Sequence, residues 1–236
     1  AVALADPGFA SLSAIAAPQI AASTIATAIL TPILTAYIAK QKKRTDEVNN
    51  RSFPGTDEEK ILVIADDFTG ANDTGVQFSK RKLKSTVLLN KDNISKSLED
   101  CDVLIVDTES RFDDKEKAYK KTYEIGKIVK AKKIKCFYKK LDSTFRGNIG
   151  AEISGLMDSL EIQHAIVVPA FPSNQRITKN GMVYIKGQLL AESETSDDPR
   201  TPVRESFIPK IISQQTDKST GIINFADVQA GKQSLI

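Results

Sequence analysis

From residue 61 onward, short continuous apolar runs alternate with stretches in which apolar residues recur at helical spacing. The runs are rich in β-branched residues, which is typical of strands buried on both faces of a sheet. They predict strands over Ile61–Ala65, Thr86–Leu89, Val103–Val106, Cys136–Tyr138 and Ala165–Val168. The stretches between them predict helices over Asn72–Arg81, Asp114–Lys130 and Gly150–Leu160. This alternation predicts an α/β fold with a mostly parallel sheet and helices on both faces.

The pattern weakens beyond Pro172. Val183–Ile185, followed by Gly187, predicts a hairpin. Phe207–Ile212 predicts a short helix, and Ile222–Asn224 predicts a further strand.

The first forty residues differ from the rest, because no Asp, Glu, Lys or Arg occurs from Gly8 to Ala39. Since about 20 apolar residues cross a bilayer, residues 17–39 predict a transmembrane helix. The basic cluster Lys40–Arg44 then places the following chain in the cytoplasm. A signal peptide is disfavoured because the positive charges follow the apolar run instead of preceding it. A buried Ala-rich helix of a soluble domain stays open as the alternative.

The chain therefore divides into three predicted parts. Residues 1–40 form the transmembrane-like helix, residues 41–60 a polar linker, and residues 61–236 the α/β domain. We expect this domain to be cytoplasmic and anchored to the inner membrane by the N-terminal helix.

Composition narrows the classes of function. The net charge is only +3, so nucleic acid is not an expected partner. With His164 as the single histidine, a His-based metal site or catalytic triad is not expected either. Cys101 and Cys136 match no metal or redox spacing, and we expect reduced thiols rather than a disulfide.

Charged and hydroxyl-bearing residues follow four of the predicted strands. In an open parallel sheet, ligands bind at the carboxyl ends of the strands, so these residues are expected to share one rim. The candidate substrate-binding residues are Asp66, Asp67, Arg111, Lys140, Asp142, Ser143, Thr144 and Arg146.

Carboxylates follow the predicted strand Ile61–Ala65, and a guanidinium group follows Val103–Val106. Asp66 and Asp67 can accept hydrogen bonds from a polyol or bind Mg²⁺, and the alternative is that one of them caps the next helix. Arg111 offers a planar fork for a carboxylate or phosphate, and the alternative is a surface salt bridge.

The apolar run Cys136–Tyr138 leads into a segment rich in hydroxyl groups. Ser143 and Thr144, with the backbone amides of residues 147–148, suit an anion at a helix N-terminus; the alternative is turn and cap chemistry alone. Strand alternation would point Lys140 and Asp142 the same way. No Walker A sequence and no Gly-x-Gly-x-x-Gly follows a strand, so an ATP site is expected elsewhere.

At these motifs the chain resembles the four-carbon acid sugar kinases, from about Ile61 to the end. The matching segments are Ile64–Gly75, Thr108–Arg111, Tyr138–Glu152, Pro169–Pro172 and Asp198–Val203. The preceding residues resemble the C-terminal end of 2-keto-3-deoxygluconate permeases, at Ala5–Pro7, Ala21-Ala22 and Thr27–Ala36.

The resemblance implies an ATP-dependent kinase that phosphorylates the terminal hydroxyl of D-threonate, D-erythronate or a 3-oxo-tetronate. It implies that this chain supplies the acid-binding domain, and that ATP and Mg²⁺ bind mainly in a second domain expected to be absent here. It assigns substrate binding to the candidate residues above, Asp66 and Arg146 included. The chain departs from the family pattern at Arg176-Ile177-Thr178 and Lys179-Asn180, which puts the exact acid in doubt.

Two alternatives remain open. One is a membrane-tethered sugar-acid sensor or permease accessory domain without kinase activity. The other is an accidental join of two adjacent genes. The sequence leaves the oligomeric state open.

Overall fold

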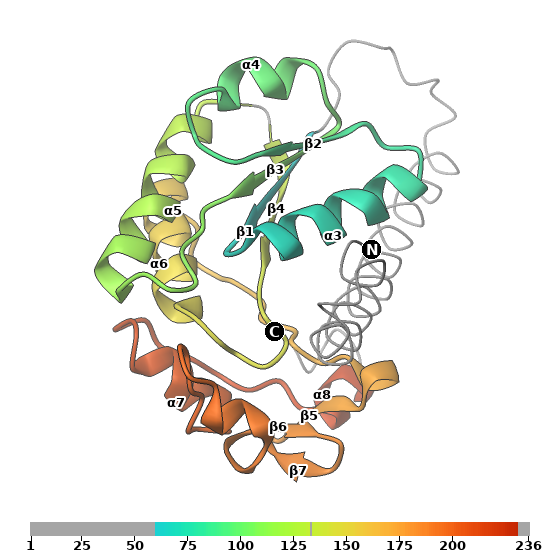
Figure 1. Ribbon diagram of the computed structural model, residues 1–236, viewed down its shortest axis with the longest axis vertical. Coiled ribbons are helices and arrows are strands. Elements are labelled where there is room, and N and C mark those ends of the chain that lie inside the picture. The colour runs from blue at the N-terminus through green and yellow to red at the C-terminus, as the bar shows by residue number, and fades with distance from the viewer. Residues whose placement is uncertain (1–59, 133, 231–236) are drawn as a thin grey trace, which may run out of the picture.

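The computed structural model describes residues 60–132 and 134–230, and its centre is a four-stranded parallel sheet (Figure 1). The strands lie in the order β2-β3-β1-β4, so each connection from β1 to β2 and from β3 to β4 crosses over one strand. Their bounds are β1 Lys60–Ala65, β2 Ser85–Leu88, β3 Val103–Asp107 and β4 Ile134–Lys140. The predicted parallel α/β sheet is confirmed.

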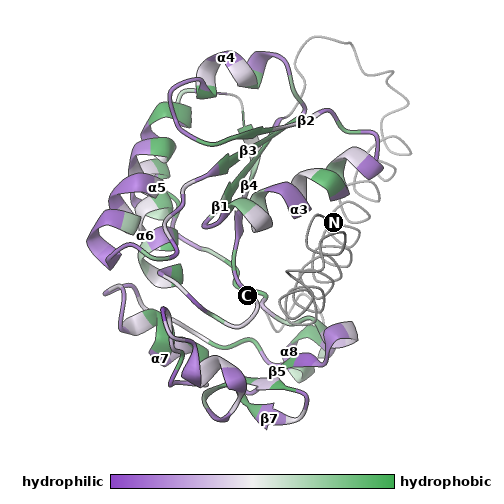
Figure 2. Cartoon of the chain, in the orientation of Figure 1, coloured by the Kyte–Doolittle hydropathy of each residue, from purple (hydrophilic) through white to green (hydrophobic). Residues whose placement is uncertain are grey.

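Helices cover both faces of this sheet, as predicted. The side chains of β1 alternate between the two faces: Val63 packs in a cluster with Phe78 of α3, and Leu62 packs in a cluster with Ile125 of α5. The covering helices are α3 Phe68–Lys80 on one face, and α4 Ile94–Glu99, α5 Lys115–Val129 and α6 Ile149–Leu160 on the other. Figure 2 shows the apolar strands at the centre and polar residues on the outer sides of the helices.

A second, antiparallel sheet follows the first in the chain. It consists of β5 Arg176–Lys179, β6 Met182–Ile185 and β7 Gln188–Leu189. Asn180-Gly181 and Lys186-Gly187 join these strands, and all four residues have positive φ angles of 50°, 74°, 51° and 85°. Such two-residue turns match the twist of a hairpin. The hairpin predicted at Val183–Ile185 is confirmed.

A third apolar cluster ties the two sheets together. Phe145 and Ile149, which follow β4, are buried against Val183 and Ile185 of β6. The small sheet is thereby fixed beside the carboxyl end of β4 (Figure 1). The remaining elements are the 3₁₀ turns η2 Pro172–Asn174, η3 Leu190–Glu192 and η4 Glu194–Asp197, and the helices α7 Ile208–Ser213 and α8 Phe225–Ala230.

Two predicted strands are wrong. Ala165–Val168 runs through an irregular segment in which Ile166 is 84% exposed, and Ile222–Asn224 likewise pairs with no strand. Among the described residues, neither segment forms backbone hydrogen bonds to a neighbouring strand, and an apolar run without a partner cannot form a ladder. The predicted short helix at Phe207–Ile212 is confirmed by α7, whereas α4 and α8 were not predicted.

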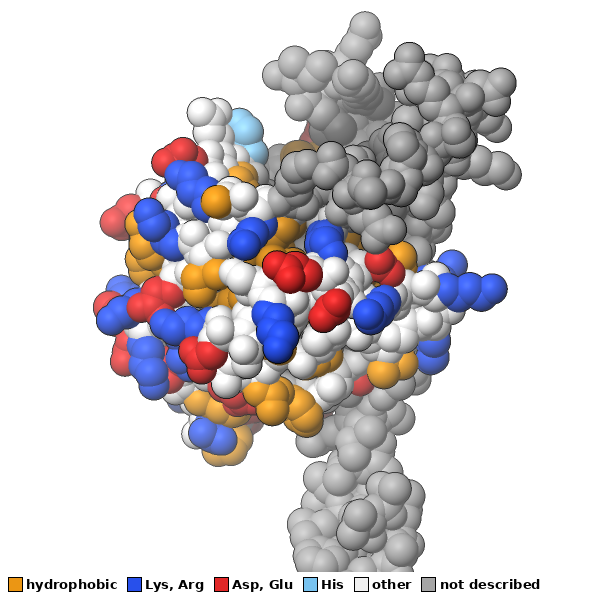
Figure 3. Space-filling view, turned by 90° about the horizontal axis from the view of Figure 1, so that it is seen from above, with side chains coloured by type: hydrophobic (Ala, Val, Ile, Leu, Met, Phe, Trp, Pro, Cys, Tyr) orange, Lys and Arg blue, Asp and Glu red, His pale blue; other side chains and the backbone are white. Residues whose placement is uncertain are grey.

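Charges are mixed on the end of the molecule that carries α4. Figure 3 shows Lys and Arg interspersed with Asp and Glu there, without a large field of one sign. In residues 60–132 and 134–230, no helix is both long enough and apolar enough to cross a membrane. The predicted transmembrane segment, residues 17–39, and the predicted linker, residues 41–60, lie outside the described part, apart from Lys60.

Candidate functional site

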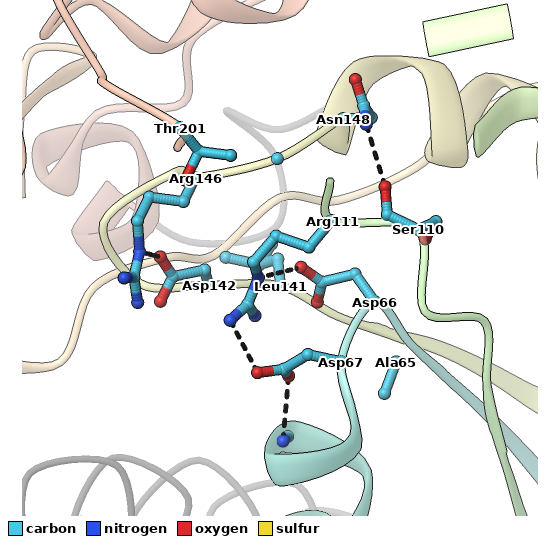
Figure 4. A network of polar contacts seen from close by, with 12 residues as sticks. Ala65, Asp66, Asp67, Ser110, Arg111, Leu141, Asp142, Arg146, Asn148 and Thr201 are labelled. Carbon is cyan, nitrogen blue, oxygen red and sulfur yellow. Dashed lines mark hydrogen bonds and ion pairs between the residues drawn. The ribbon is translucent and has the colours of Figure 1, made fainter. Parts of the chain in front are cut away.

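The strand register brings the polar segments to one edge of the parallel sheet. Ala65 lies opposite Asp107 of β3 and opposite Lys140 of β4. The three strands therefore end at the same level, and the segments that follow them start side by side. Figure 4 shows side chains from all three segments gathered at this edge. The geometric expectation of one shared rim is met by Asp66, Asp67, Arg111 and Asp142.

Arg111 joins the two aspartates that follow β1. Its Nε lies 2.7 Å from Asp66 Oδ2, and its Nη1 lies 2.6 Å from Asp67 Oδ2. The other oxygen of Asp67 accepts a hydrogen bond of 2.9 Å from the backbone N–H of Gly70 and so caps α3. This cap explains why α3 begins at Phe68 rather than at Asn72. Burial lowers the pKa of Arg111, but the carboxylates outweigh it and the net pKa is raised.

Asp66 belongs to a buried ion cluster with Lys139 and Glu152. Lys139 Nζ lies 2.9 Å from Glu152 Oε2 and 3.6 Å from Asp66 Oδ1, and the three side chains are 8%, 0% and 2% exposed. Ser110 donates a hydrogen bond to Glu152. Burial raises the pKa of Glu152, whereas the pKa of Asp66 is lowered because Lys139 and Arg111 outweigh its burial.

The sequence interpretation missed Lys139 and Glu152. Glu152 shares the helix face of the apolar residues Ile149, Ile153 and Leu156, all of which follow each other at helical spacing. A charged residue within an apolar stripe is rarely buried without a partner. The position of Glu152 in the sequence therefore already indicated a buried ion pair.

Asp142 and Arg146 form a second ion pair at the rim. Arg146 Nε lies 2.6 Å from Asp142 Oδ2, and Thr144 donates a hydrogen bond of 2.6 Å to the same oxygen. Arg146 Nη1 also lies 3.3 Å from Asp198 Oδ2 (Figure 4 shows the Arg146–Asp142 contact). Burial raises the pKa of Asp142, but Arg146, Arg111 and Thr144 outweigh it, so the net pKa is well below the usual range.

Lys140 and Ser143 complete the predicted set. Lys140 Nζ donates to the carbonyl oxygen of Leu141 at 3.1 Å, and Ser143 accepts a hydrogen bond from Arg176. The strand ends at Lys140, so the alternation argument does not extend to Asp142. In the first turn of α6, the backbone N–H of Gly150 donates a hydrogen bond of 2.7 Å to Gln215 Oε1. This N–H group therefore already has a partner within the protein.

A further carboxyl group near the rim was not predicted. Asp107, the last residue of β3, is 3% exposed, and burial raises its pKa from 3.8 to about 6. Its Oδ1 accepts a hydrogen bond of 3.0 Å from the N–H of Glu109. Sequence alone placed Asp107 at a strand end, and its burial comes from the neighbouring strands.

A hollow of about 570 Å³ adjoins the rim. The turn at Gly147-Asn148 and the segment Arg200–Glu205 line it, and Arg111 is the one predicted site residue among its lining. Within the described part of the chain, no cluster of three or more His, Cys, Asp or Glu residues is arranged to hold a metal ion. Asp66 and Asp67, considered above as Mg²⁺ ligands, both bind Arg111.

Curated relatives are proteins named for kinases of small sugar acids. The chain is 36% identical over 178 residues to the D-threonate kinase of Salmonella typhimurium, which is 75% of this chain and 42% of that protein. It is 34% identical over 179 residues to the D-erythronate kinase of Heliobacterium modesticaldum, covering 75% and 40%. It is 32% identical over 169 residues to the 3-oxo-tetronate kinase of Escherichia coli, covering 70% and 43%. The chain thus spans less than half the length of these relatives.

Solved structures have the same fold over the same region. A Bordetella bronchiseptica domain of unknown function, crystallised with bound citrate as a domain-swapped dimer, is 32% identical with a TM-score of 0.62. The match covers 65% of this chain and 39% of that one. A Salmonella typhimurium protein described as a putative tRNA synthase is 28% identical with a TM-score of 0.63, covering 75% and 43%.

Two family models match different parts of the chain. Residues 1–44 match the model described as 2-keto-3-deoxygluconate permease, in agreement with the resemblance seen in the sequence. Residues 61–236, well over half of the chain, match the model described as sugar-binding N-terminal domain. The chain therefore belongs to the family of the sugar-binding N-terminal domain, the domain found in the four-carbon acid sugar kinases.

Proposed function

We propose that residues 61–236 bind a four-carbon sugar acid as the acceptor domain of an ATP-dependent sugar-acid kinase. The observation that carries this proposal is the ion-paired rim of Asp66, Asp67, Arg111 and Asp142 at the carboxyl ends of the parallel strands. Polar ligands bind at this edge in open α/β sheets. The names of the relatives supply the substrate class: D-threonate, D-erythronate or 3-oxo-tetronate.

The rim offers both donors and acceptors to a polyhydroxy acid. The contacts of Arg111 to described residues use Nε and Nη1, so Nη2 is available to an oxygen of the ligand. Lys140, with its Nζ on a backbone carbonyl, supplies a second donor. The carboxylates of Asp67 and Asp142 offer acceptor oxygens for hydroxyl hydrogens. The hydroxyl group of Thr144 lies beside Asp142, and that of Ser143 accepts a hydrogen bond from Arg176.

Phosphoryl transfer requires mainly positioning and charge neutralisation. In this proposal the rim holds the acid so that its terminal hydroxyl faces a second domain, which binds ATP and Mg²⁺. That domain corresponds to the part of the relatives that this chain does not cover. We therefore expect residues 61–236 by themselves to bind the acid without phosphorylating it. The proposed location of residues 61–236 is the cytoplasm, with residues 17–39 as a membrane anchor.

Calorimetric titration of the full chain tests the proposal. We expect binding of at least one of D-threonate, D-erythronate and 3-oxo-tetronate, and weaker binding of the six-carbon 2-keto-3-deoxygluconate. Absence of binding by all three four-carbon acids would refute the proposal.

An Asp67→Asn variant tests the site itself. Asn keeps an oxygen that can cap α3, but it removes the carboxylate beside Arg111 and one acceptor oxygen for the ligand. We expect affinity for the acid to fall roughly 10-fold, as for loss of a charged hydrogen bond. Asp92→Asn is the matched control, since Asp92 is exposed in the loop before α4, and it should bind as the unchanged chain does.

A second candidate is a sugar-acid-binding accessory domain of a permease, without kinase activity. The match of residues 1–44 to the permease model favours it. Supplying the second domain of a relative, with ATP, separates the two: phosphorylation of a bound four-carbon acid supports the kinase, and binding without phosphorylation supports the accessory domain.

A further inference from the structure

The two arginines predicted at the rim already have carboxylate partners, whereas Lys140 donates to a backbone carbonyl oxygen. Arg111 contacts Asp66 and Asp67, and Arg146 contacts Asp142 and Asp198. Two carboxylates carry more negative charge than the one guanidinium group that they share can neutralise. Neither arginine is therefore well suited to balance the charge of an incoming anion.

Arg176 differs from these two arginines. It is partly buried, and its hydrogen bond to a described side chain is the one that Nη1 donates to the Ser143 hydroxyl. Among residues 60–132 and 134–230, no carboxylate oxygen lies within ion-pair distance of its guanidinium group. Burial lowers the pKa of Arg176, and the carboxylates of Asp142 and Glu194 only partly offset this. The guanidinium group thus carries a positive charge with which no described carboxylate pairs directly.

The backbone holds Arg176 firmly at the rim. Arg176 N donates to the carbonyl oxygen of the fully buried Phe171 at 3.1 Å, and Phe171 N donates back at 2.7 Å. This pair closes the turn formed by residues 172–175, and Lys186 N fixes the turn through a 2.8 Å bond to Gln175 O. A cation on such a braced strand loses little freedom when a ligand binds.

We propose that Arg176, on the second sheet, is the residue that neutralises the carboxylate of the bound sugar acid. This inference rests on the proposed function and extends the site from the parallel sheet to β5. Ser143 keeps the guanidinium group beside the hydroxyl-rich loop after β4. The ion pairs of Arg111 and Arg146 then orient hydroxyl groups, while Arg176 selects acids over neutral polyols.

Comparison of an acid with its neutral isostere isolates this role. Binding of D-erythronate and D-threonate to the full chain is measured beside binding of the corresponding aldonamides, by ligand-observed NMR titration into the tens-of-millimolar range. The variants are Arg176→Gln, which keeps a donor for Ser143 but removes the charge, and Arg176→Lys, which keeps the charge but removes the fork. Arg81→Gln, at an exposed arginine just after the C-terminal end of α3 and away from the rim, is the matched control.

The unchanged chain should prefer the acid over its amide roughly 10- to 100-fold, the usual effect of a charge-assisted hydrogen bond. Arg176→Gln should reduce this preference to about 1 while amide affinity stays within about 2-fold, and Arg176→Lys should lie between the two. Arg81→Gln should leave both affinities unchanged.

Other results separate the two proposals. An unchanged acid-to-amide ratio in Arg176→Gln, or an equal loss of both ligands, would overturn the role of Arg176 while the proposed function stands. Equal binding of acid and amide by the unchanged chain would also overturn it. Absence of any sugar-acid binding would overturn the proposed function itself.

Discussion

Replacement of Lys139 by methionine probes the ion cluster beneath the rim. Lys139 Nζ is shared between Glu152 at 2.9 Å and Asp66 at 3.6 Å, and none of the three side chains is more than 8% exposed. Methionine fills a similar volume without the charge. Both buried carboxylates then lose the cation that they share.

The size of the effect follows from what each carboxylate retains. Breaking a buried ion pair by removing one partner costs about 3–5 kcal/mol. Asp66 keeps Arg111, and Glu152 keeps the hydrogen bond from Ser110, so we expect the lower end, about 3 kcal/mol at pH 8. Domain stabilities are about 5–15 kcal/mol, so this is a large share of the total.

The penalty should depend on pH. Burial already raises the pKa of Glu152, and loss of Lys139 removes the main opposing influence. A carboxyl group whose folded-state pKa is raised binds more protons in the folded state, so the free energy of unfolding rises as pH falls. The loss caused by Lys139→Met should therefore shrink between pH 8 and pH 5.

Urea unfolding followed by far-ultraviolet circular dichroism measures this, because the chain has no tryptophan for fluorescence. Lys130→Met is the matched control: its ion pair to Glu161 is exposed, and its loss should leave stability unchanged. A cost for Lys139→Met below about 1 kcal/mol, or one that grows toward acid pH, would refute the reasoning.

Two further variants test the packing and the electrostatics of the fold. Gly155→Ala should destabilise the domain by about 1–3 kcal/mol, because the added Cβ would lie 2.4 Å from the Tyr119 carbonyl oxygen. Gly221→Ala is the control: its added Cβ meets open space, so the free energy of unfolding in the same urea titration should hardly change. Asp107→Asn should stabilise the domain by about 1–3 kcal/mol above pH 6, where the buried carboxyl group must ionise, and the gain should vanish as pH falls from 6 to 4. A gain that is equal at pH 8 and pH 4 would show that charge is not the cause.

The local sequence was sufficient to predict the parallel sheet and the polar segments at its edge. The β-branched runs in β1 and β3 are buried on both faces, so they are recognisable without knowledge of their neighbours. Asp67 directly precedes a helix and caps it, which is a contact between near neighbours in the chain. Asn180-Gly181 is an equally local signal for the turn between β5 and β6, but β5 was not among the predicted strands.

The tertiary structure alone decided how distant charges pair. Nothing near Arg111 in the sequence indicates that it binds two aspartates 44 and 45 positions earlier. Whether Ala165–Val168 forms a strand likewise depended on the presence of a partner strand alongside it. Backbone preference and burial pattern are properties of a short segment, and they can be read from it. Ion pairing and strand pairing depend on the residue that folding brings opposite, so Arg176 could be recognised as a cation at the rim with no directly paired described carboxylate only after the two sheets were placed together.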